Sequence, residues 1–228
     1  MNYFDLFLKE EDHQIVKTFH DFVEREIMPV RNLIDDDKNH EIVEKIMQGL
    51  VNIGLQRASF PEEYGGSGLS SALTNALVHE ELGRGDSGIG CAATVTGWAW
   101  LPALIAGNKT VLDKFAPMFC SEEVKIGCFC MTEPGGAHGG GGCDIENPTL
   151  EGRKIKTTAR LEGDEWVING QKMWTTNSGI ADLYCVVCTT DPNLGEEGIA
   201  LIYVPSPCEG LSFGPFEKLA GFSGDRVC

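Results

Sequence analysis

The sequence predicts an α+β protein: an all-α N-terminal domain over residues 1–124, followed by an antiparallel β-barrel domain over residues 125–228. Three observations support this. Apolar residues recur at helical spacing through the first half. From about Ile126 the pattern changes to short β-type runs. Turn signals such as Asn169-Gly170 then separate these runs. No linker-like composition lies between the halves, so we expect them to pack tightly.

Five helices are expected in the first half. The first covers about residues 9–27 and ends before Pro29, because proline disfavours a helical conformation in the residue before it. The second is expected to end at Gly54, a residue suited to the C-terminal cap. The fourth is apolar nearly all round, which places it in a core or beneath a pocket. After the first helix, the expected ranges are 41–53, 70–84, 88–106 and 111–119.

The second half shows seven β-type runs, which we interpret as the strands of the barrel. They cover residues 126–132, 154–161, 165–169, 171–176, 183–189, 199–204 and 211–216. Residues 222–228 contain no closing turn, and a barrel that stopped there would carry an unpaired edge strand. We therefore expect the chain either to be cut from something longer or to be completed by another chain.

Charge and hydropathy exclude several classes of partner. The chain has 34 acidic and 18 basic residues among 228, a net charge of −16, which argues against nucleic acid and anionic membrane surfaces. No apolar run approaches the ~18 residues of a membrane span. The N-terminus lacks the basic and apolar regions of a signal peptide. These features favour a cytoplasmic protein with no membrane partner.

The nine cysteines lie inside apolar runs, where a free thiol behaves as a small buried hydrophobe. Such usage is typical of a reducing compartment. The one C-x-x-C pattern, Cys185 and Cys188, has no second pair at zinc-site spacing, and a strand would point its two sulfurs to opposite faces. We expect no metal site.

Two stretches carry the candidate chemistry. Residues 129–136 form a strand that enters a glycine-rich turn, and residues 171–177 carry Trp174 beside two threonines. If they face one another, they frame a flat slot with an indole on one side and hydroxyl and N–H groups on the other. Flavin is the planar cofactor that best fits such a slot. The alternatives are that Trp174 is a core aromatic and that Thr132 and Thr176 are ordinary strand residues.

These stretches also carry a resemblance. Met131-Thr132-Glu133-Pro134-Gly135 and the later run from Asn169 to Asn177 resemble motifs of the acyl-CoA dehydrogenase family. Weaker matches occur at residues 60–66, 79–83 and 106–108. The resemblance covers most of the chain and corresponds to the N-terminal helical and middle β domains of that family.

The resemblance implies FAD as cofactor and oxidation of an acyl-CoA thioester between its α and β carbons, with hydride transfer to flavin N5. It places Phe129, Met131 and Thr132 against the pyrimidine side of the flavin. It places the Trp174 indole against the isoalloxazine and Thr176 near N5. Donors around a reduced flavin and a dry face for substrate are also what hydride transfer requires.

The family's C-terminal helical domain, which carries the catalytic glutamate and subunit contacts, has no counterpart in this sequence. We therefore assign no catalytic residue and expect this chain alone to be inactive, because removal of an α-proton needs a positioned base. The resemblance implies an acyl-CoA substrate and electron-transferring flavoprotein as oxidant. It also implies a homo- or hetero-oligomer with a chain that supplies the missing domain.

The glycine-rich segment 135–152 departs from the family pattern by its length and by the loss of a serine near the cofactor. Cys143 stands where that serine is expected, and His138 is a candidate cation for a phosphate. Adjacent glycines leave backbone N–H groups free to approach a phosphate. A flexible loop with a solvated histidine is the alternative.

Two other functions remain open from the sequence. The chain can be a non-catalytic or FAD-holding subunit of a heteromeric acyl-CoA dehydrogenase. It can also be a flavin monooxygenase with the same fold.

Overall fold

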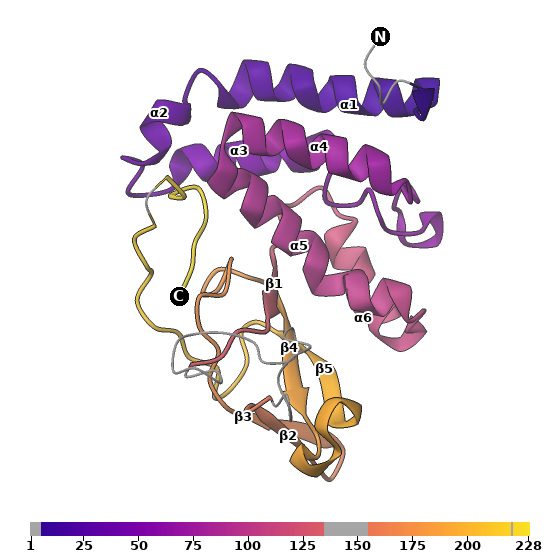
Figure 1. The fold of residues 1–228 in the computed structure, drawn as a ribbon, viewed down its shortest axis with the longest axis vertical. Helices are drawn as coiled ribbons and strands as arrows, with labels where there is room; N and C mark the ends of the chain where they lie inside the picture. Colours follow the sequence, from indigo (N-terminus) through magenta and orange to yellow (C-terminus); the bar gives the residue numbers. More distant parts are fainter. Residues whose placement is uncertain (1–5, 135–154, 220) are drawn as a thin grey trace.

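The computed structural model describes residues 6–134, 155–219 and 221–228. Its helices occupy one end of the molecule and its small sheet the other (Figure 1). The helical elements are α1 (Glu10–Phe22), the π-helix η2 (Val23–Ile27), α2 (Arg31–Ile34), α3 (Glu41–Asn52), the 3-10 turn η3 (Glu62–Tyr64), α4 (Ala72–Gly85), α5 (Ser87–Ile105) and α6 (Lys109–Phe119). The five expected helices are all present, and α2 is an additional short one.

Local capping explains where the helices begin and end. Gly54 follows α3 in the left-handed region, with φ of 91°. Its N–H donates to the Val51 carbonyl at 2.9 Å, and the Leu55 N–H donates to the Leu50 carbonyl at 3.0 Å. This pair of bonds is the Schellman motif, so the predicted glycine cap is confirmed. At the start of α4 the Ser71 side chain accepts from the Thr74 N–H.

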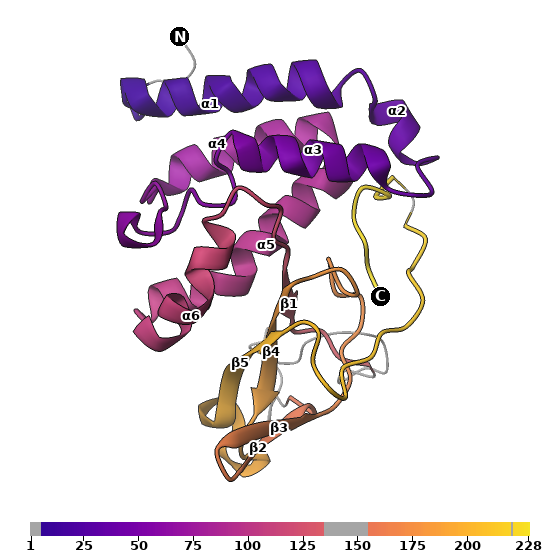
Figure 2. The same cartoon turned by 180° about the vertical axis from the view of Figure 1, so that it is seen from behind.

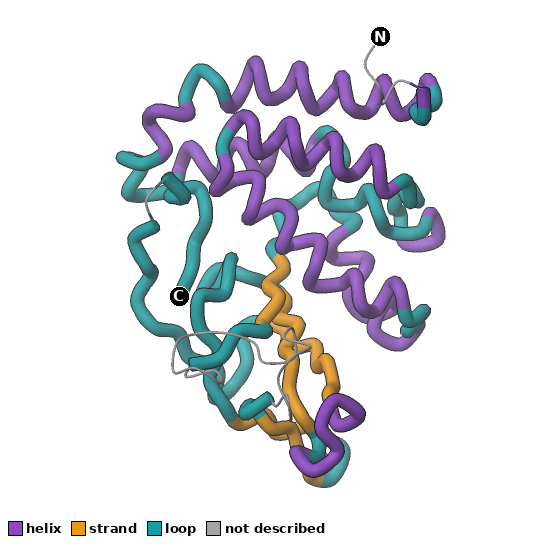
Figure 3. The backbone as a smooth tube through the Cα atoms, in the orientation of Figure 1, coloured by secondary structure: helices purple, strands orange, loops and turns teal. Residues whose placement is uncertain are grey.

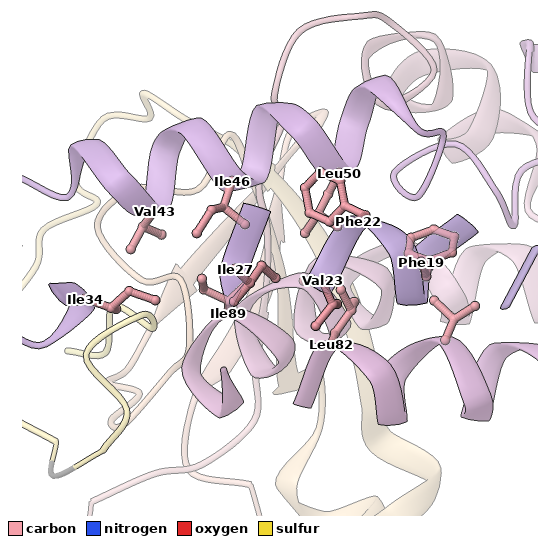
Figure 4. Close-up of a cluster of buried hydrophobic side chains, with 12 residues drawn as sticks. Phe19, Phe22, Val23, Ile27, Ile34, Val43, Ile46, Leu50, Leu82 and Ile89 are labelled. Atoms are coloured by element: carbon pink, nitrogen blue, oxygen red, sulfur yellow. The ribbon is translucent and has the colours of Figure 1, made fainter. Parts of the chain in front are cut away.

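A hydrophobic core joins α1, η2, α2, α3, α4 and α5 (Figure 4). Each helix except the short α2 contributes apolar residues at helical spacing, so the stripes predicted from the sequence meet in one cluster. The buried members are Phe19, Phe22, Val23, Ile27, Ile34, Val43, Ile46, Leu50, Val78, Leu82, Ile89 and Ala93.

Helix α5 connects this helical core to the sheet. With 19 residues and a mean hydropathy of 1.4, it is long and apolar enough to cross a membrane. The prediction that no apolar run approaches the length of a membrane span was therefore wrong. Yet 56% of this apolar stretch is buried inside the protein, and α5 packs against α3, α4 and β1. This burial is typical of the core helix of a folded domain.

The sheet is mixed and open, so the predicted antiparallel barrel was wrong. Its strands are β1 (Gly127–Cys130), β2 (Thr158–Glu162), β3 (Glu165–Asn169), β4 (Leu183–Thr189) and β5 (Ile199–Pro205). Strand β4 runs parallel to β1 and antiparallel to β5, while β2 and β3 form a hairpin that meets β4 in parallel. Alternation of side chains predicts strands but not their relative direction, which depends on the connections.

Two predicted strands, 171–176 and 211–216, are not strands (Figure 3). Trp174 and Asn177 adopt positive φ values of 55° and 66°, which turn the chain instead of extending it. Residues after β5 run from the sheet toward α2 and then turn back (Figure 1, Figure 2). They end against the 175–177 turn, where the Asn177 N–H donates to the Arg226 carbonyl at 2.7 Å. Residues 222–228 therefore do not form the unpaired edge strand that was expected there.

Candidate functional site

One edge of β1 pairs with no other strand in the part of the chain that the structure describes, and it is called the open edge below. Within the described residues, β1 pairs only with β4. Gly127 points its backbone away from β4: its N–H donates to Thr96 Oγ1 at 3.4 Å and its carbonyl accepts from Asn177 Nδ2 at 3.0 Å. Backbone groups in a strand alternate in direction, so Phe129, two residues later, also turns its N–H and carbonyl toward the open edge.

The turn that carries Trp174 lies against the end of β1. The Met173 N–H donates to the Thr132 carbonyl at 3.0 Å, and Lys172 Nζ donates to the Met131 carbonyl at 2.9 Å. The two stretches singled out from the sequence are therefore adjacent, although about forty residues separate them.

The Trp174 side chain is 53% exposed, which excludes its interpretation as a core aromatic. Its left-handed backbone, with φ of 55°, is unfavourable for a bulky residue. Such strain concentrates at functional sites, where the surrounding structure holds it in place. Thr132 and Thr176 lie outside the named strands, so β-propensity does not explain them either.

Buried Glu133 anchors this arrangement. Its carboxylate accepts from the Lys156 N–H at 2.7 Å, from the Thr157 N–H at 2.8 Å and from Lys172 Nζ at 2.9 Å. Burial by itself raises the pKa of Glu133, but these hydrogen bonds outweigh it and hold the pKa below its ordinary value. Glu133 therefore fixes the 131–134 turn to its neighbours and has no free oxygen with which to act as a base.

A second buried carboxylate, Asp225, lies behind Thr176. Thr176 Oγ1 donates to Asp225 Oδ2 at 2.8 Å, while Oδ1 has no partner among the described residues. Cys91 of α5 completes the cluster, with its Sγ 3.8 Å from Thr176 Oγ1. Burial raises the pKa of Asp225 above its ordinary value, and the hydrogen bond from Thr176 offsets only part of that rise.

Asn177 holds the turn to both domains. Its side-chain amide, in a residue only 1% exposed, donates to the carbonyls of Ala92 and Gly127 at 2.9 and 3.0 Å. Gly127 is needed at this junction, because a Cβ there would lie 2.7 Å from the Cβ of Ala99. Asn177 was predicted only as part of a motif, and neither Asp225 nor Cys91 was predicted as a site residue. No local signal marks the last two, since their partner is distant in the sequence.

The remaining candidate residues from the sequence are one histidine and three cysteines. His138, Cys143 and the rest of the glycine-rich segment lie outside the described residues. Cys185 and Cys188 are buried free thiols, and burial raises the pKa of Cys185 to about 12. The described part of the chain contains no group of three or more His, Cys, Asp or Glu side chains suited to a metal ion.

A cavity of about 420 Å³ lies between α3, α5 and the turn at Arg226, lined by His40, Glu44 and several apolar residues. Neither Trp174 nor Thr132 lines it. This cavity therefore does not coincide with the slot that the sequence predicts beside Trp174.

Comparison with known families and proteins gives matches along most of the chain. Residues 9–123 match the acyl-CoA dehydrogenase N-terminal domain and residues 128–228 match the acyl-CoA dehydrogenase middle domain. The human mitochondrial short-chain specific acyl-CoA dehydrogenase is 34% identical over 221 residues, which are 96% of this chain and 50% of that protein.

Solved structures give the same result. Butyryl-CoA dehydrogenase from Megasphaera elsdenii superposes with a TM-score of 0.80 at 27% identity, over 96% of this chain and 55% of that one. An acyl-CoA dehydrogenase complexed with FAD from Bacillus anthracis superposes with a TM-score of 0.78 at 28% identity, over 96% and 35% of the two chains. This chain spans about half the length of the curated relatives it matches.

Proposed function

Because this chain belongs to the acyl-CoA dehydrogenase family, of which it holds the N-terminal and middle domains, we propose that it holds FAD in the slot beside Trp174. FAD, when bound there, supplies the acceptor for a hydride taken from an acyl-CoA thioester. The proposal rests chiefly on one observation, the Met173–Thr132 hydrogen bond of 3.0 Å that brings the half-exposed indole to the open edge of β1.

The residues present fit a flavin. The open edge at Phe129 and Met131 provides backbone groups for the polar pyrimidine side of the ring. The exposed Trp174 indole provides an apolar face for the isoalloxazine, and stacking of this kind is favourable for planar rings. In this proposal Thr132 and Thr176 supply hydroxyl groups to the polar edge of the ring. The left-handed backbone of Trp174 costs about 1–3 kcal/mol, and strain of this size is typical of ligand-binding sites.

The proton-removing base comes from outside the described residues in this proposal. Among those residues, the buried carboxylates nearest the slot are Glu133 and Asp225, and both are closed off from a substrate, at 4% and 7% exposure. We therefore propose that α,β-dehydrogenation requires a further segment or chain that carries the base. Acyl-CoA as substrate and electron-transferring flavoprotein as oxidant follow from the family resemblance and belong to the same proposal.

Flavin binding is the direct test. Purified protein is titrated with FAD, and binding is measured by quenching of flavin fluorescence and by the shift of its absorption bands. Trp174→Ala is expected to abolish or strongly weaken binding. Trp166→Ala is the matched control, since Trp166 is also an exposed indole, at 48%, but lies on β3 away from the slot.

Loss of binding in both variants, or in neither, would contradict this placement of the flavin. The non-catalytic scaffold is distinguished by the same experiment, because a subunit that only supports a partner tolerates Trp174→Ala. Acyl-CoA oxidation is then assayed with the flavin-loaded protein, with and without a polypeptide that carries the family's C-terminal helical domain. Activity is expected only in the completed assembly.

A further inference from the structure

Of the cluster formed by Asp225, Thr176 and Cys91, only Thr176 has a role in the function proposed above. It lies where the last described turn presses against the first turn of α5. A Cβ on Gly88 would lie 2.8 Å from the Gly224 nitrogen and 3.0 Å from the Asp225 nitrogen, so the two backbones are in direct contact. Such close contact holds the Asp225 carboxyl in one place relative to the Trp174 turn.

The three residues of this cluster differ in their exposure to solvent. Thr176 and Cys91 are partly exposed, whereas Asp225 is 7% exposed and its Oδ1 is both buried and without a hydrogen-bond partner among the described residues. Asp225 therefore cannot touch a molecule in the slot. The 2.8 Å hydrogen bond from the Thr176 hydroxyl joins it to a residue that is partly exposed.

That hydrogen bond determines what Thr176 offers to the slot. A hydroxyl has one proton and two lone pairs, and an ionised carboxylate only accepts. While Asp225 is ionised, the Thr176 proton is committed to it and the hydroxyl presents lone pairs to a ligand. Once Asp225 is protonated, it can donate to Thr176, which frees the Thr176 proton for an acceptor in the slot.

We propose that Asp225 is a positioning residue that sets the hydrogen-bonding direction of Thr176, so that its protonation selects between flavin states in the slot. This inference rests on the proposed flavin site. The ring of oxidised flavin offers a lone pair at N5, whereas reduced flavin carries an N–H there. Protonated Asp225 therefore favours the oxidised ring, and ionised Asp225 favours a ligand that donates a proton.

The surroundings of Asp225 allow it to titrate on its own. The thiols of Cys91 on α5 and Cys128 on β1 face it, and burial raises the pKa of both, so they stay neutral where Asp225 titrates. The charged side chains of Asp86 and Arg226 have contacts of their own. Asp86 accepts from the Ile89 N–H at the start of α5, and the Arg226 guanidinium lies over the Phe216 ring. Burial also raises the pKa of Asp225 itself above its ordinary value.

The test is the pH dependence of oxidised FAD binding by the full chain, measured from mildly acidic to neutral pH by fluorescence titration. In the wild type the dissociation constant is expected to rise about two- to tenfold as Asp225 ionises, the net value of one hydrogen bond. Asp225→Asn should give a flat profile, since an amide does not titrate. Thr176→Val should also give a flat profile, and the double variant should add nothing to it.

Asp182→Asn is the control. Asp182 lies in the same domain and accepts from the Ile126 N–H at 2.9 Å, but no hydrogen bond among the described residues joins it to Thr176. Its variant should keep the wild-type profile. A pH dependence that persists in Asp225→Asn, or independent effects of the Asp225 and Thr176 substitutions, would refute the positioning role while leaving the flavin site intact. Absence of FAD binding in the wild type would refute both.

Discussion

Two buried carboxylates in the β half of the chain, Glu133 and Asp225, have opposite electrostatic environments. Glu133 accepts hydrogen bonds from two backbone N–H groups and from Lys172 Nζ. Asp225 accepts from one hydroxyl and leaves its Oδ1 without a partner among the described residues. Their pKa values accordingly move apart, below the ordinary value for Glu133 and above it for Asp225. Burial raises the pKa of both carboxyl groups; hydrogen bonds, one of them from the Lys172 ammonium, outweigh it at Glu133, whereas burial outweighs the hydrogen bonds at Asp225.

The two environments fit different roles, a structural one for Glu133 and a functional one for Asp225. A fully satisfied carboxylate with a lowered pKa stabilises the fold at neutral pH, and Glu133 does so by joining β1 to residues 156, 157 and 172. An incompletely satisfied carboxylate with a raised pKa costs stability at neutral pH. Natural proteins retain such groups chiefly at functional sites.

The largest effect is expected for Glu133→Gln. The substitution leaves the Lys172 ammonium buried without its counter-charge and replaces an acceptor of backbone N–H groups by an amide, part of which donates. We expect a loss of about 3 kcal/mol in the free energy of unfolding at neutral pH, the usual cost of breaking a buried pair. Urea denaturation followed by circular dichroism measures it.

The pH dependence of this loss has a definite sign. Because the pKa of Glu133 is lowered in the folded state, its stabilisation is present above the unfolded-state pKa and disappears as pH falls through the folded-state value. The difference between wild type and Glu133→Gln should therefore shrink in acid. Asp21→Asn is the control, since the Lys17–Asp21 pair is exposed and its removal should leave the unfolding midpoint unchanged. Equal effects of the two substitutions would show that the Glu133 network is not structural.

A smaller effect is expected for Thr176→Val, which removes the hydroxyl that Asp225 accepts from. The change should cost about 1.5–2 kcal/mol at neutral pH, because a buried ionised carboxylate loses a charge-assisted hydrogen bond. Thr176→Ser keeps the hydroxyl and should stay close to the wild type. If the valine and serine variants unfold at the same urea concentration, Thr176 does not stabilise the Asp225 carboxylate.

How much of this could be predicted from the sequence depends on the range of the interactions. The helices and the Gly54 cap follow from local spacing and backbone preferences, and they were predicted correctly. The parallel pairing of β1 with β4 could not be predicted, because the alternation of apolar residues is the same in parallel and antiparallel sheets. Strand prediction failed at residues 171–176 because nothing local indicates that Trp174 adopts a left-handed backbone.

The candidate site divides in the same way. Its two stretches are recognisable as continuous motifs, and their adjacency could be hypothesised before the fold was known. The Asp225–Thr176 hydrogen bond joins residues 49 positions apart, and Cys91 comes from a different domain. Each of these residues has an ordinary local context, so only the packing of the last turn against α5 reveals the cluster.

The smallest expected effect, and the one opposite in sign, is for Asp225→Asn. Because the pKa of Asp225 is raised in the folded state, its contribution to stability is fully present below the unfolded-state pKa and is lost as pH rises through the folded-state value. At neutral pH the protein bears the cost of a buried charge, which the neutral amide removes while its oxygen still accepts from Thr176. Asp225→Asn should therefore raise the free energy of unfolding by about 1 kcal/mol at neutral pH. The gain should vanish in acid, as urea midpoints at the two pH values will show. A loss of stability at neutral pH would mean that Arg226 or the N-terminus of α5 stabilises the ionised carboxylate, and the contrast with Glu133 would then fail.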